Sequence, residues 1–463
     1  MKLSFHGADR AVTGSCHLLE CLDRRILIDC GLFQGSRDVG EENAADFGFD
    51  PATIDYVLLT HAHLDHCGRL PLLVKRGFKG EVITTSASRE LSRLVLVDAA
   101  HLQGEEARRR TRQRRRRGEE DAPPPLYTVL DAFNCLDRFG RTAEYGQPLQ
   151  LASDLRATFF DAGHILGSAS ILMEVGDHGG TRSILFSGDL GNAGRPLLRP
   201  PQPPARADIV VMESTYGDRP HRSIGDSIEE LHGAISSTLS RGGNVIIPTF
   251  ALERAQEILY ILRQSVERSR LPPTMQVFLD SPMAIEATEI FKRHFECLSS
   301  EAASLFREGQ DPLHLANLHL VRESADSVAI NRISGGAVIM AGSGMCTGGR
   351  IRHHLRHNIW RKEAAIIFVG FAASGTIARQ IIDGAKSVRL FEEDIPVRST
   401  IYTINGFSAH ADQSELLAWR RRIEGCETTF LVHGEEPAMQ LLSDQLSGQR
   451  VEAPRRGDVF DLW

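Results

Sequence analysis

The sequence lacks closely spaced cysteines, a long apolar run and an excess of basic charge. Its eight cysteines are scattered over 463 residues without a CxxC pair, which argues against both a disulfide framework and a thiolate zinc site. No run of about 18 apolar residues occurs, and the N-terminal stretch MKLSFHGADRAVTGS has no signal-peptide core. We therefore expect reduced thiols, a cytoplasmic location and no membrane association.

The net charge of −7 has the wrong sign for a protein that coats nucleic acid nonspecifically, because such proteins carry an overall basic field. A polyanionic substrate would have to bind in a local basic groove. A chain of 463 residues exceeds the length at which one hydrophobic core keeps growing, so two domains are expected.

Apolar periodicity divides the chain into regions. Up to residue 208, short apolar runs such as RILIDCGLF and SILFSGDLG end in Gly or Asp, which indicates a strand-rich layer with little room for long helices. From residue 224 to 395, helical and strand patterns alternate, which predicts βαβ units on a parallel sheet. After residue 396 the pattern returns to strand, polar loop and helix.

One segment stands apart by its charge. Residues 105–121, EEARRRTRQRRRRGEED, contain eight arginines flanked by acids on both sides. Contact with nucleic acid is one interpretation of this segment. A solvated helix end or a disordered loop is the other, and the local acids favour it.

The motif THAHLDH at residues 60–66 places three histidines and an aspartate directly after the apolar run YVLL. His61 and His63 lie two apart, so in an extended segment their imidazoles project from the same side. Asp65 and His66 follow where the chain turns and can face a second point nearby. Imidazole and carboxylate ligands without sulfur suit zinc or a similar divalent ion. The motif therefore predicts metal binding.

Four ligands on one loop cannot complete two open catalytic metal sites, so further donors are expected at other strand ends. His164 follows ATFFDAG, Asp189 follows SILFSG and His433 follows TTFLV, each next to a glycine. Such a residue taken alone would more often serve as a turn or cap. Three with the same layout predict additional metal ligands.

These motifs resemble, in order, those of the metallo-β-lactamase superfamily and specifically its β-CASP nucleases, such as ribonuclease J and the cleavage and polyadenylation endonuclease. The resemblance is carried by THAHLDH, GH at 163–164, GD at 188–189, MESTYG at 212–217, GFSAHAD at 406–412 and LVHG at 431–434. It implies an α/β fold, a metallo-β-lactamase αββα sandwich with an inserted α/β β-CASP cap domain. The expected boundaries are 1–208 and 396–463 for the sandwich and 209–395 for the cap.

The same resemblance implies a pair of zinc ions and assigns their ligands. It implies that His61, His63 and His164 hold one ion, that Asp65, His66 and His433 hold the other, and that Asp189 bridges them. Asp29 matches a position that orients the ligand loop. Manganese accepts the same nitrogen and oxygen ligands, so the metal identity stays open.

Two divalent ions about 3.5 to 4 Å apart lower the pKa of a shared water and neutralise a phosphodiester. Attack by a metal-bridged hydroxide would leave a 5′-phosphate and a 3′-hydroxyl, and the departing 3′ oxygen needs a proton. His410 in SAHAD is the candidate acid. The resemblance implies that Glu213 in MEST accepts a hydrogen bond from this imidazole and favours its protonated form. Asp412 is an alternative partner, and a helix- or turn-capping role for Glu213 also stays open.

Two glycine-rich turns fit a polyanionic substrate. IMAGSGMCTGGRIRHHL and IFVGFAASGTIARQII each run from strand through small-residue turn to helix, which directs backbone N–H groups at a phosphate, although tight turns alone would explain the glycines. The candidate phosphate contacts are Ser343, Gly344, Thr347 and Gly348, with Arg350 or His354 behind them, and Ser374 and Thr376 in the second turn.

The leading hypothesis is a zinc-dependent ribonuclease that cuts single-stranded RNA as an endonuclease, with a 5′ to 3′ exonuclease activity left open. RNA is favoured because the resemblance places histidine at the last ligand position, His433 here, in RNA-processing members. The alternative is a metallohydrolase of a small thioester or lactone, and a noncatalytic scaffold is a third reading. Whether the protein forms a homodimer stays open.

Overall fold

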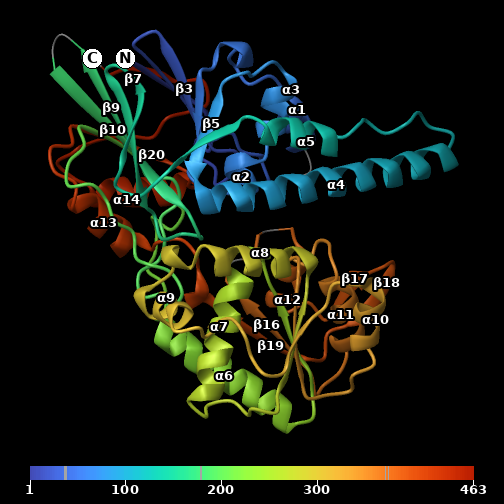
Figure 1. Ribbon diagram of the computed structural model, residues 1–463. Coiled ribbons are helices and arrows are strands. Elements are labelled where there is room, and N and C mark those ends of the chain that lie inside the picture. The colour runs from blue at the N-terminus through green and yellow to red at the C-terminus, as the bar shows by residue number, and fades with distance from the viewer. Residues whose placement is uncertain (36–38, 178–179, 371, 374, 463) are drawn as a thin grey trace. The chain divides into compact units, whose positions relative to one another are not determined.

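A computed structural model describes residues 1–35, 39–177, 180–370, 372–373 and 375–462. The chain divides into two compact units (Figure 1). The first unit comprises Met1–Ala193, Pro200–Pro220 and His410–Trp463, and the second comprises Gly194–Arg199 and His221–Ala409. The second unit is thus an insertion in the first, as the motif order predicted.

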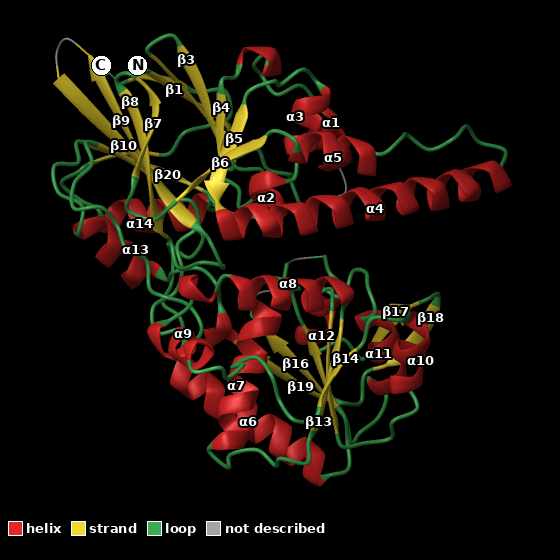
Figure 2. Cartoon of the chain, viewed as in Figure 1, coloured by secondary structure: helices red, strands yellow, loops and turns green. Residues whose placement is uncertain are grey.

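Two mixed sheets form the centre of the first unit (Figure 2). The first sheet has the order β22 (Val459–Asp461), β1 (Lys2–Gly7), β2 (Cys16–Cys21), β3 (Arg24–Ile28), β4 (Tyr56–Leu58), β5 (Glu81–Thr85), β6 (Phe139–Ala143). The second has the order β21 (Arg450–Glu452), β20 (Thr428–Val432), β11 (Ile209–Glu213), β10 (Gly180–Phe186), β9 (Ala169–Asp177), β8 (Leu155–Asp161), β7 (Pro148–Ala152). Phe5 of the first sheet and Phe159 and Phe430 of the second belong to one buried core, so the sheets pack face to face.

Helices cover the outer faces of this sandwich. Beside the first sheet lie α1 (Val39–Ala44), α2 (Leu64–Cys67), α3 (Leu70–Lys75), α4 (Ser86–Arg116) and α5 (Val129–Leu136). Beside the second lie α13 (Gln413–Arg421) and α14 (Glu436–Gln445), whose Leu416 and Met439 pack with Leu185 and Leu431 of the strands. The order helix, sheet, sheet, helix confirms the predicted αββα sandwich.

The expectation of little room for long helices is wrong for α4, which is 31 residues long. Thr85 caps its first turn by accepting a hydrogen bond from the Ser88 amide. Its buried side chains end at Ala100, so the apolar periodicity covers only the first half of the helix. The rest is mostly charged, and its one large apolar residue, Leu102, is exposed, so it shows no apolar periodicity.

The second unit contains a parallel sheet. Its order is β14 (Leu318–Leu320), β13 (Gln276–Asp280), β15 (Ala337–Ala341), β12 (Val245–Pro248), β16 (Ala365–Val369), β19 (Thr400–Ile404), and β17 (Ser387–Leu390) pairs separately with β18 (Glu393–Pro396). Its helices are α6 (Ile224–Ser240), α7 (Arg254–Glu267), α8 (Pro282–Arg293), α9 (Ser300–Arg307), α10 (Ser324–Ile330), α11 (Ile351–Asn358) and α12 (Ile377–Ile382). Val245 packs with α6 and α7 while Ile246 packs with α11 and α12. The strands are therefore apolar on both faces, and the predicted βαβ pattern is confirmed.

The observed division into two units differs from the predicted boundaries at two strands. β11, placed in the cap by the boundary at 209, pairs with β10 and β20 of the sandwich. β19, placed in the sandwich by the boundary at 396, pairs with β16 of the second unit. An apolar run indicates that a strand forms but not which sheet it joins, so the sequence pattern could not separate these cases.

The expectations about cysteines and membranes can be compared with the fold. All eight cysteines are free thiols, so no disulfide contributes to stability. In the part of the chain that the structure describes, no helix combines the length and the apolar character needed to cross a bilayer.

Candidate metal centre and its acid

The ligand turn begins directly after β4 and is held against the end of β3. His63 lies at the N-cap of α2, and Asp65 and His66 follow in its single turn. Gly31 packs against this turn so closely that a Cβ there would lie 1.6 Å from the Asp65 carbonyl oxygen. The glycine thus lets two backbone segments touch and fixes where the ligands point.

A first group of side chains converges at His63. The Nε2 atoms of His61 and His164 each lie 3.2 Å from His63 Nδ1. The same two Nε2 atoms lie 3.5 Å from Asp189 Oδ2. His61, His63, His164 and Asp189 together offer four ligand atoms within 4.8 Å of one another.

A second group lies beside the first. His66 Nε2 is 3.4 Å from His433 Nε2, which is 3.6 Å from Asp65 Oδ2. The other carboxylate oxygen of Asp189, Oδ1, lies 3.2 Å from His66 Nε2 and 3.6 Å from His433 Nδ1. The two oxygens of Asp189 therefore face the two groups separately, which is the arrangement of a bridging carboxylate.

These residues fit a pair of divalent cations. Imidazole nitrogens that meet at 3.2 to 3.4 Å repel through their lone pairs unless a proton or cation lies between them. Asp189 Oδ1 is buried, and within the described residues it makes no hydrogen bond of good geometry. A buried acceptor of this kind is costly unless a cation satisfies it. The donor set of imidazoles and carboxylates suits zinc or manganese.

The pKa shifts of the ligand histidines also agree with a metal site. Burial lowers the pKa of His61 and of His63, so both are neutral and able to donate a lone pair. Burial also acts on His66, but the carboxylates of Asp189 and Asp29 outweigh it and raise the pKa of His66. A proton on Nε2 of His66, on the side of Asp189, thus takes the place that a metal cation would fill, while Nδ1 faces Asp29.

Asp29 supports the ligands from behind. Its Oδ2 atom lies 2.7 Å from His66 Nδ1, and its Oδ1 atom accepts a hydrogen bond from the Thr60 amide at 2.8 Å. Accepting the Nδ1 proton leaves Nε2 of His66 as the lone-pair donor toward the metal position. Asp29 therefore lies where its motif position suggests.

Two threonines also orient ligand histidines, and the sequence pattern did not single them out. Thr60 Oγ1 lies 3.1 Å from His61 Nδ1, and Thr215 Oγ1 lies 3.1 Å from His433 Nδ1. Each can fix the ring orientation of its histidine. Their positions inside THAHLDH and MESTYG were the available signal, since both stand beside residues already assigned.

His410 lies beside the first group, and its ring contacts Glu213. His410 Nδ1 is 3.2 Å from both carboxylate oxygens of Glu213, and Nε2 is 4.0 Å from Asp189 Oδ2. Glu213 is fully buried and anchored by the Leu190 amide, which donates to Oε1 at 2.6 Å. Burial alone would lower the pKa of His410, but the carboxylates, Glu213 first and then Asp189 and Asp65, outweigh it and raise that pKa to about 9. The imidazole is therefore a proton donor at neutral pH.

Asp412, the alternative partner of His410, has another role. It is the N-cap of α13, where its Oδ1 atom accepts hydrogen bonds from the Glu415 amide at 3.0 Å and from Ser414 Oγ at 2.6 Å. Glu415 reciprocates at the Asp412 amide, which completes a capping box. The geometry favours Glu213 over Asp412 as the partner of the imidazole.

The predicted phosphate contacts lie in the second unit. Ser343, Gly344, Thr347 and Gly348 form the loop between β15 and α11, where Ser343 Oγ is 3.4 Å from both Thr347 Oγ1 and the Gly348 amide. Behind it, Arg350 donates to Asp280 at 2.7 Å and His354 Nε2 lies 2.6 Å from the same carboxylate. Both side chains thus hold the loop in place.

The second predicted turn is less informative. Thr376 caps α12 by accepting a hydrogen bond from the Arg379 amide at 3.2 Å, which is the capping role that a tight turn would need. Ser374 lies outside the described residues.

Comparison with protein families covers nearly the whole chain. Residues 10–248 match the model of the metallo-beta-lactamase superfamily, and residues 255–381 match the Beta-Casp domain. Residues 394–454 match the Zn-dependent metallo-hydrolase RNA specificity domain. The chain belongs to the β-CASP branch of the metallo-β-lactamase superfamily.

Individual relatives agree with this assignment. The chain is 41% identical to "Ribonuclease TTHA0252" of Thermus thermophilus, over 99% of each chain. It is 32% identical to "Transcription termination factor FttA" of Methanocaldococcus jannaschii, over 94% of this chain and 67% of that one, and 30% identical to an "RNase J-like protein" of the same organism, over 94% and 92%. A crystal structure of a protein of unknown function from Enterococcus faecalis shares the fold, with a TM-score of 0.58, 12% identity and 99% coverage of both chains.

The family and the His/Asp cluster support a divalent-metal hydrolase that acts on nucleic acid. They lend no support to the alternative of a thioester or lactone hydrolase. The noncatalytic scaffold is also unsupported, because all seven predicted ligand positions lie in the two converging groups and the bridging carboxylate.

Proposed function

We propose that the protein is a zinc-dependent ribonuclease that hydrolyses phosphodiester bonds of single-stranded RNA. The observation that carries the proposal is the position of Asp189, whose Oδ2 faces His61 and His164 while Oδ1 faces His66 and His433. A site that needed only one cation would not require a carboxylate shared between two imidazole groups. The ribonuclease names of two relatives and the RNA specificity model favour RNA as substrate.

When bound, a pair of divalent cations supplies an activated water and neutralises charge on the phosphate. His61, His63 and His164 would hold one cation and Asp65, His66 and His433 the other, with Asp189 between them. Asp29, Thr60 and Thr215 keep the imidazoles turned toward the metal positions. Zinc fits this donor set best among abundant ions, and manganese is the alternative.

His410 is the proposed general acid. Its protonated Nε2 lies on the side of Asp189, 4.0 Å from Oδ2, while Nδ1 is engaged by Glu213. From this position the imidazolium would donate its proton to the departing 3′ oxygen of the RNA. The products would be a 5′-phosphate and a 3′-hydroxyl.

The proposal also includes the substrate contacts, the compartment and the oligomeric state. Ser343, Gly344, Thr347 and Gly348 are proposed to contact backbone phosphates of the substrate, with Thr376 and Ser374 as additional contacts. The free state of all eight cysteines supports a reducing compartment such as the cytoplasm. A homodimer remains a proposal without a supporting contact.

The test is cleavage of end-labelled single-stranded RNA and DNA of one sequence, with and without chelator. We expect metal-dependent cleavage of RNA. Internal cuts would identify an endonuclease, and shortening from the 5′ end an exonuclease. Equal cleavage of DNA, or cleavage that survives complete metal removal, would overturn the proposal.

A further inference from the structure

The half of α4 that follows Ala100 carries many arginines that are not needed for packing. After Ala100 no residue of α4 is buried, and this part of the helix runs out beyond the strands of its own unit (Figure 1). Among the described residues, the helix beyond Ala100 has only the returning segment 122–129 beside it, where Thr111 accepts a hydrogen bond from the Ala122 amide at 3.3 Å, so burial contributes little to this half of the helix. Between residues 105 and 116 the helix has seven arginines and two acids, which makes it a basic element on a protein of net charge −7.

The acids neutralise only some of these arginines. Glu106 pairs with Arg109 and Arg110 at 2.8 and 2.7 Å. Glu119 pairs with Arg114 at 3.3 Å, and Asp121 with Arg115 at 2.6 Å. Four arginines of the segment are thus committed to carboxylates.

Three of the other four arginines between residues 105 and 121 form a stripe. Arg108, Arg112 and Arg116 are exposed, have no ion pair among the described residues, and follow one another at intervals of four. Residues four apart lie on one face of a helix, so the stripe runs for about 12 Å along α4. Three uncompensated cations on one face cost electrostatic energy unless they meet an anion.

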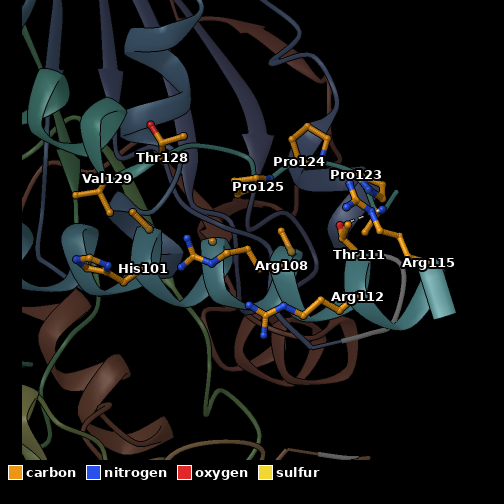
Figure 3. A pocket seen from close by; sticks show the side chains of 14 residues that line it. His101, Arg108, Thr111, Arg112, Arg115, Pro123, Pro124, Pro125, Thr128 and Val129 are labelled. Atoms are coloured by element: carbon orange, nitrogen blue, oxygen red, sulfur yellow. Dashed lines mark hydrogen bonds between the residues drawn. The ribbon is translucent and has the colours of Figure 1, made fainter. Parts of the chain in front are cut away.

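A groove accompanies this stripe. α4 and the returning segment 122–129 enclose about 670 Å³, lined by Arg108, Arg112 and Arg115 on one side and by Pro123, Pro124 and Pro125 on the other (Figure 3). The prolines stiffen the opposite wall, because their rings fix the backbone.

We propose that this groove and the stripe Arg108, Arg112 and Arg116 bind the phosphate backbone of single-stranded RNA at a distance from the metal centre. The inference rests on the proposed ribonuclease function, since it assigns the surface to the same substrate. His101 is the one aromatic side chain that lines the groove, so arginines facing backbone phosphates are the main interaction available there. The contact is therefore electrostatic and independent of base sequence, and it serves RNAs long enough to reach both sites.

The test compares two triple variants with the same change in charge. The stripe variant is Arg108→Gln, Arg112→Gln and Arg116→Gln, and the control is Arg109→Gln, Arg110→Gln and Arg114→Gln, which removes arginines already paired with acids. Glutamine keeps the helix propensity of arginine. Binding is measured with metal-loaded protein in a His410→Ala background, which cuts slowly, and cleavage is measured with His410 intact.

For an RNA of about 40 nucleotides, the Kd of the stripe variant should rise about tenfold or more, and the salt slope should fall by about 2 for three lost phosphate contacts on a single strand. Its cleavage of an RNA of about 6 nucleotides should be unchanged, because that RNA spans few contacts. The control should bind the longer RNA within about threefold of the parent, since its arginines contribute little beyond their ion pairs.

Equal weakening by both triple variants, or none by either, would overturn the proposal and leave the stripe as a solvated helix face. A stripe variant that cut the short RNA as poorly as the long one would also contradict it. Failure of the intact protein to cut either RNA would instead count against the ribonuclease function, because binding of the longer RNA is measured separately.

Discussion

The Glu213→Gln substitution tests the acid assignment most directly. Glutamine has the size of glutamate and can still accept the hydrogen bond from the Leu190 amide, so the backbone around the metal centre should stay in place. What it removes is the negative charge 3.2 Å from His410 Nδ1. The imidazole then loses the partner that favours its protonated form.

The size of the effect follows from the electrostatics of the pair. The pKa of His410 rises from 6.5 to about 9 in the presence of its neighbours, which corresponds to about 3 kcal/mol in favour of the imidazolium. Bound cations would offset the contributions of Asp189 and Asp65, so Glu213 supplies most of what remains. We expect kcat on RNA to fall about 100-fold, at the lower end of what a general acid contributes.

The assay separates proton donation from metal binding. Metal content and KM for RNA should not change in Glu213→Gln, and hydrolysis of bis(p-nitrophenyl) phosphate should remain near the parent rate, because its phenolate leaves without a proton. The limb on which RNA cleavage falls with rising pH should move to lower pH. This sign follows because the acid form exists below the pKa, and Glu213 is what raises that pKa.

Asp412→Asn is the matched control. Asparagine caps helices as well as aspartate, so α13 should be preserved and RNA cleavage should stay within about twofold of the parent, because Asp412 is not assigned to the acid. A Glu213→Gln enzyme that loses the activated substrate as fully as RNA would refute the reasoning, since the defect would then lie in the metal centre. So would an Asp412→Asn enzyme with the larger loss on RNA.

Three further outcomes are expected. Gly31→Ala should lower zinc content sharply, because its Cβ would lie 1.6 Å from the Asp65 carbonyl, whereas Gly40→Ala, which meets nothing within 4 Å, should not; equal metal content in the two would contradict the packing argument. Chelation should lower Tm, since metal at about 1,000 times Kd stabilises by about 4 kcal/mol; an unchanged Tm would show that the ligand cluster does not need a cation. Asp280→Asn should destabilise by about 3 kcal/mol in denaturant unfolding by leaving buried partners unpaired, while exposed Asp326→Asn should not. His354, Ser327 and Arg350 outweigh burial and hold the pKa of Asp280 low, so its contribution should be present above about pH 4 and lost as pH falls below it; a stability difference between parent and variant that persists at low pH would refute this.

The sequence indicated the candidate ligands but not the threonines that orient them, because the two kinds of residue leave different patterns in the sequence. His61 follows β4 of the first sheet, and Asp189 and His433 follow β10 and β20 of the second. Each is a polar residue directly after an apolar strand, so each could be recognised as a candidate ligand from its position along the chain. Thr60 and Thr215 differ from any other threonine only through the ring nitrogen each approaches, and that contact exists only in three dimensions.

The predicted domain boundaries and the expectation of no long helix differ from the structure for related reasons. β11 and β19 have the same apolar character as their neighbours, and only hydrogen-bond pairing decides which sheet each joins. The half of α4 that follows Ala100 is helical without burying any apolar side chain, so a method based on hydrophobic periodicity has nothing to detect. In both cases the information lies in partners distant along the chain or in charge.

An acidic protein that acts on a polyanion must supply positive charge where the substrate binds. In the metal centre the carboxylates of Asp65 and Asp189 keep a lowered pKa and are negative, so they would repel a phosphate. The proposed pair of cations would reverse that sign, and the ligands that would hold them repel one another without a cation. The dependence of activity on metal is therefore electrostatic as well as chemical. The same requirement makes uncompensated arginines on α4 informative, because the surrounding net charge of −7 would otherwise keep RNA away from the protein.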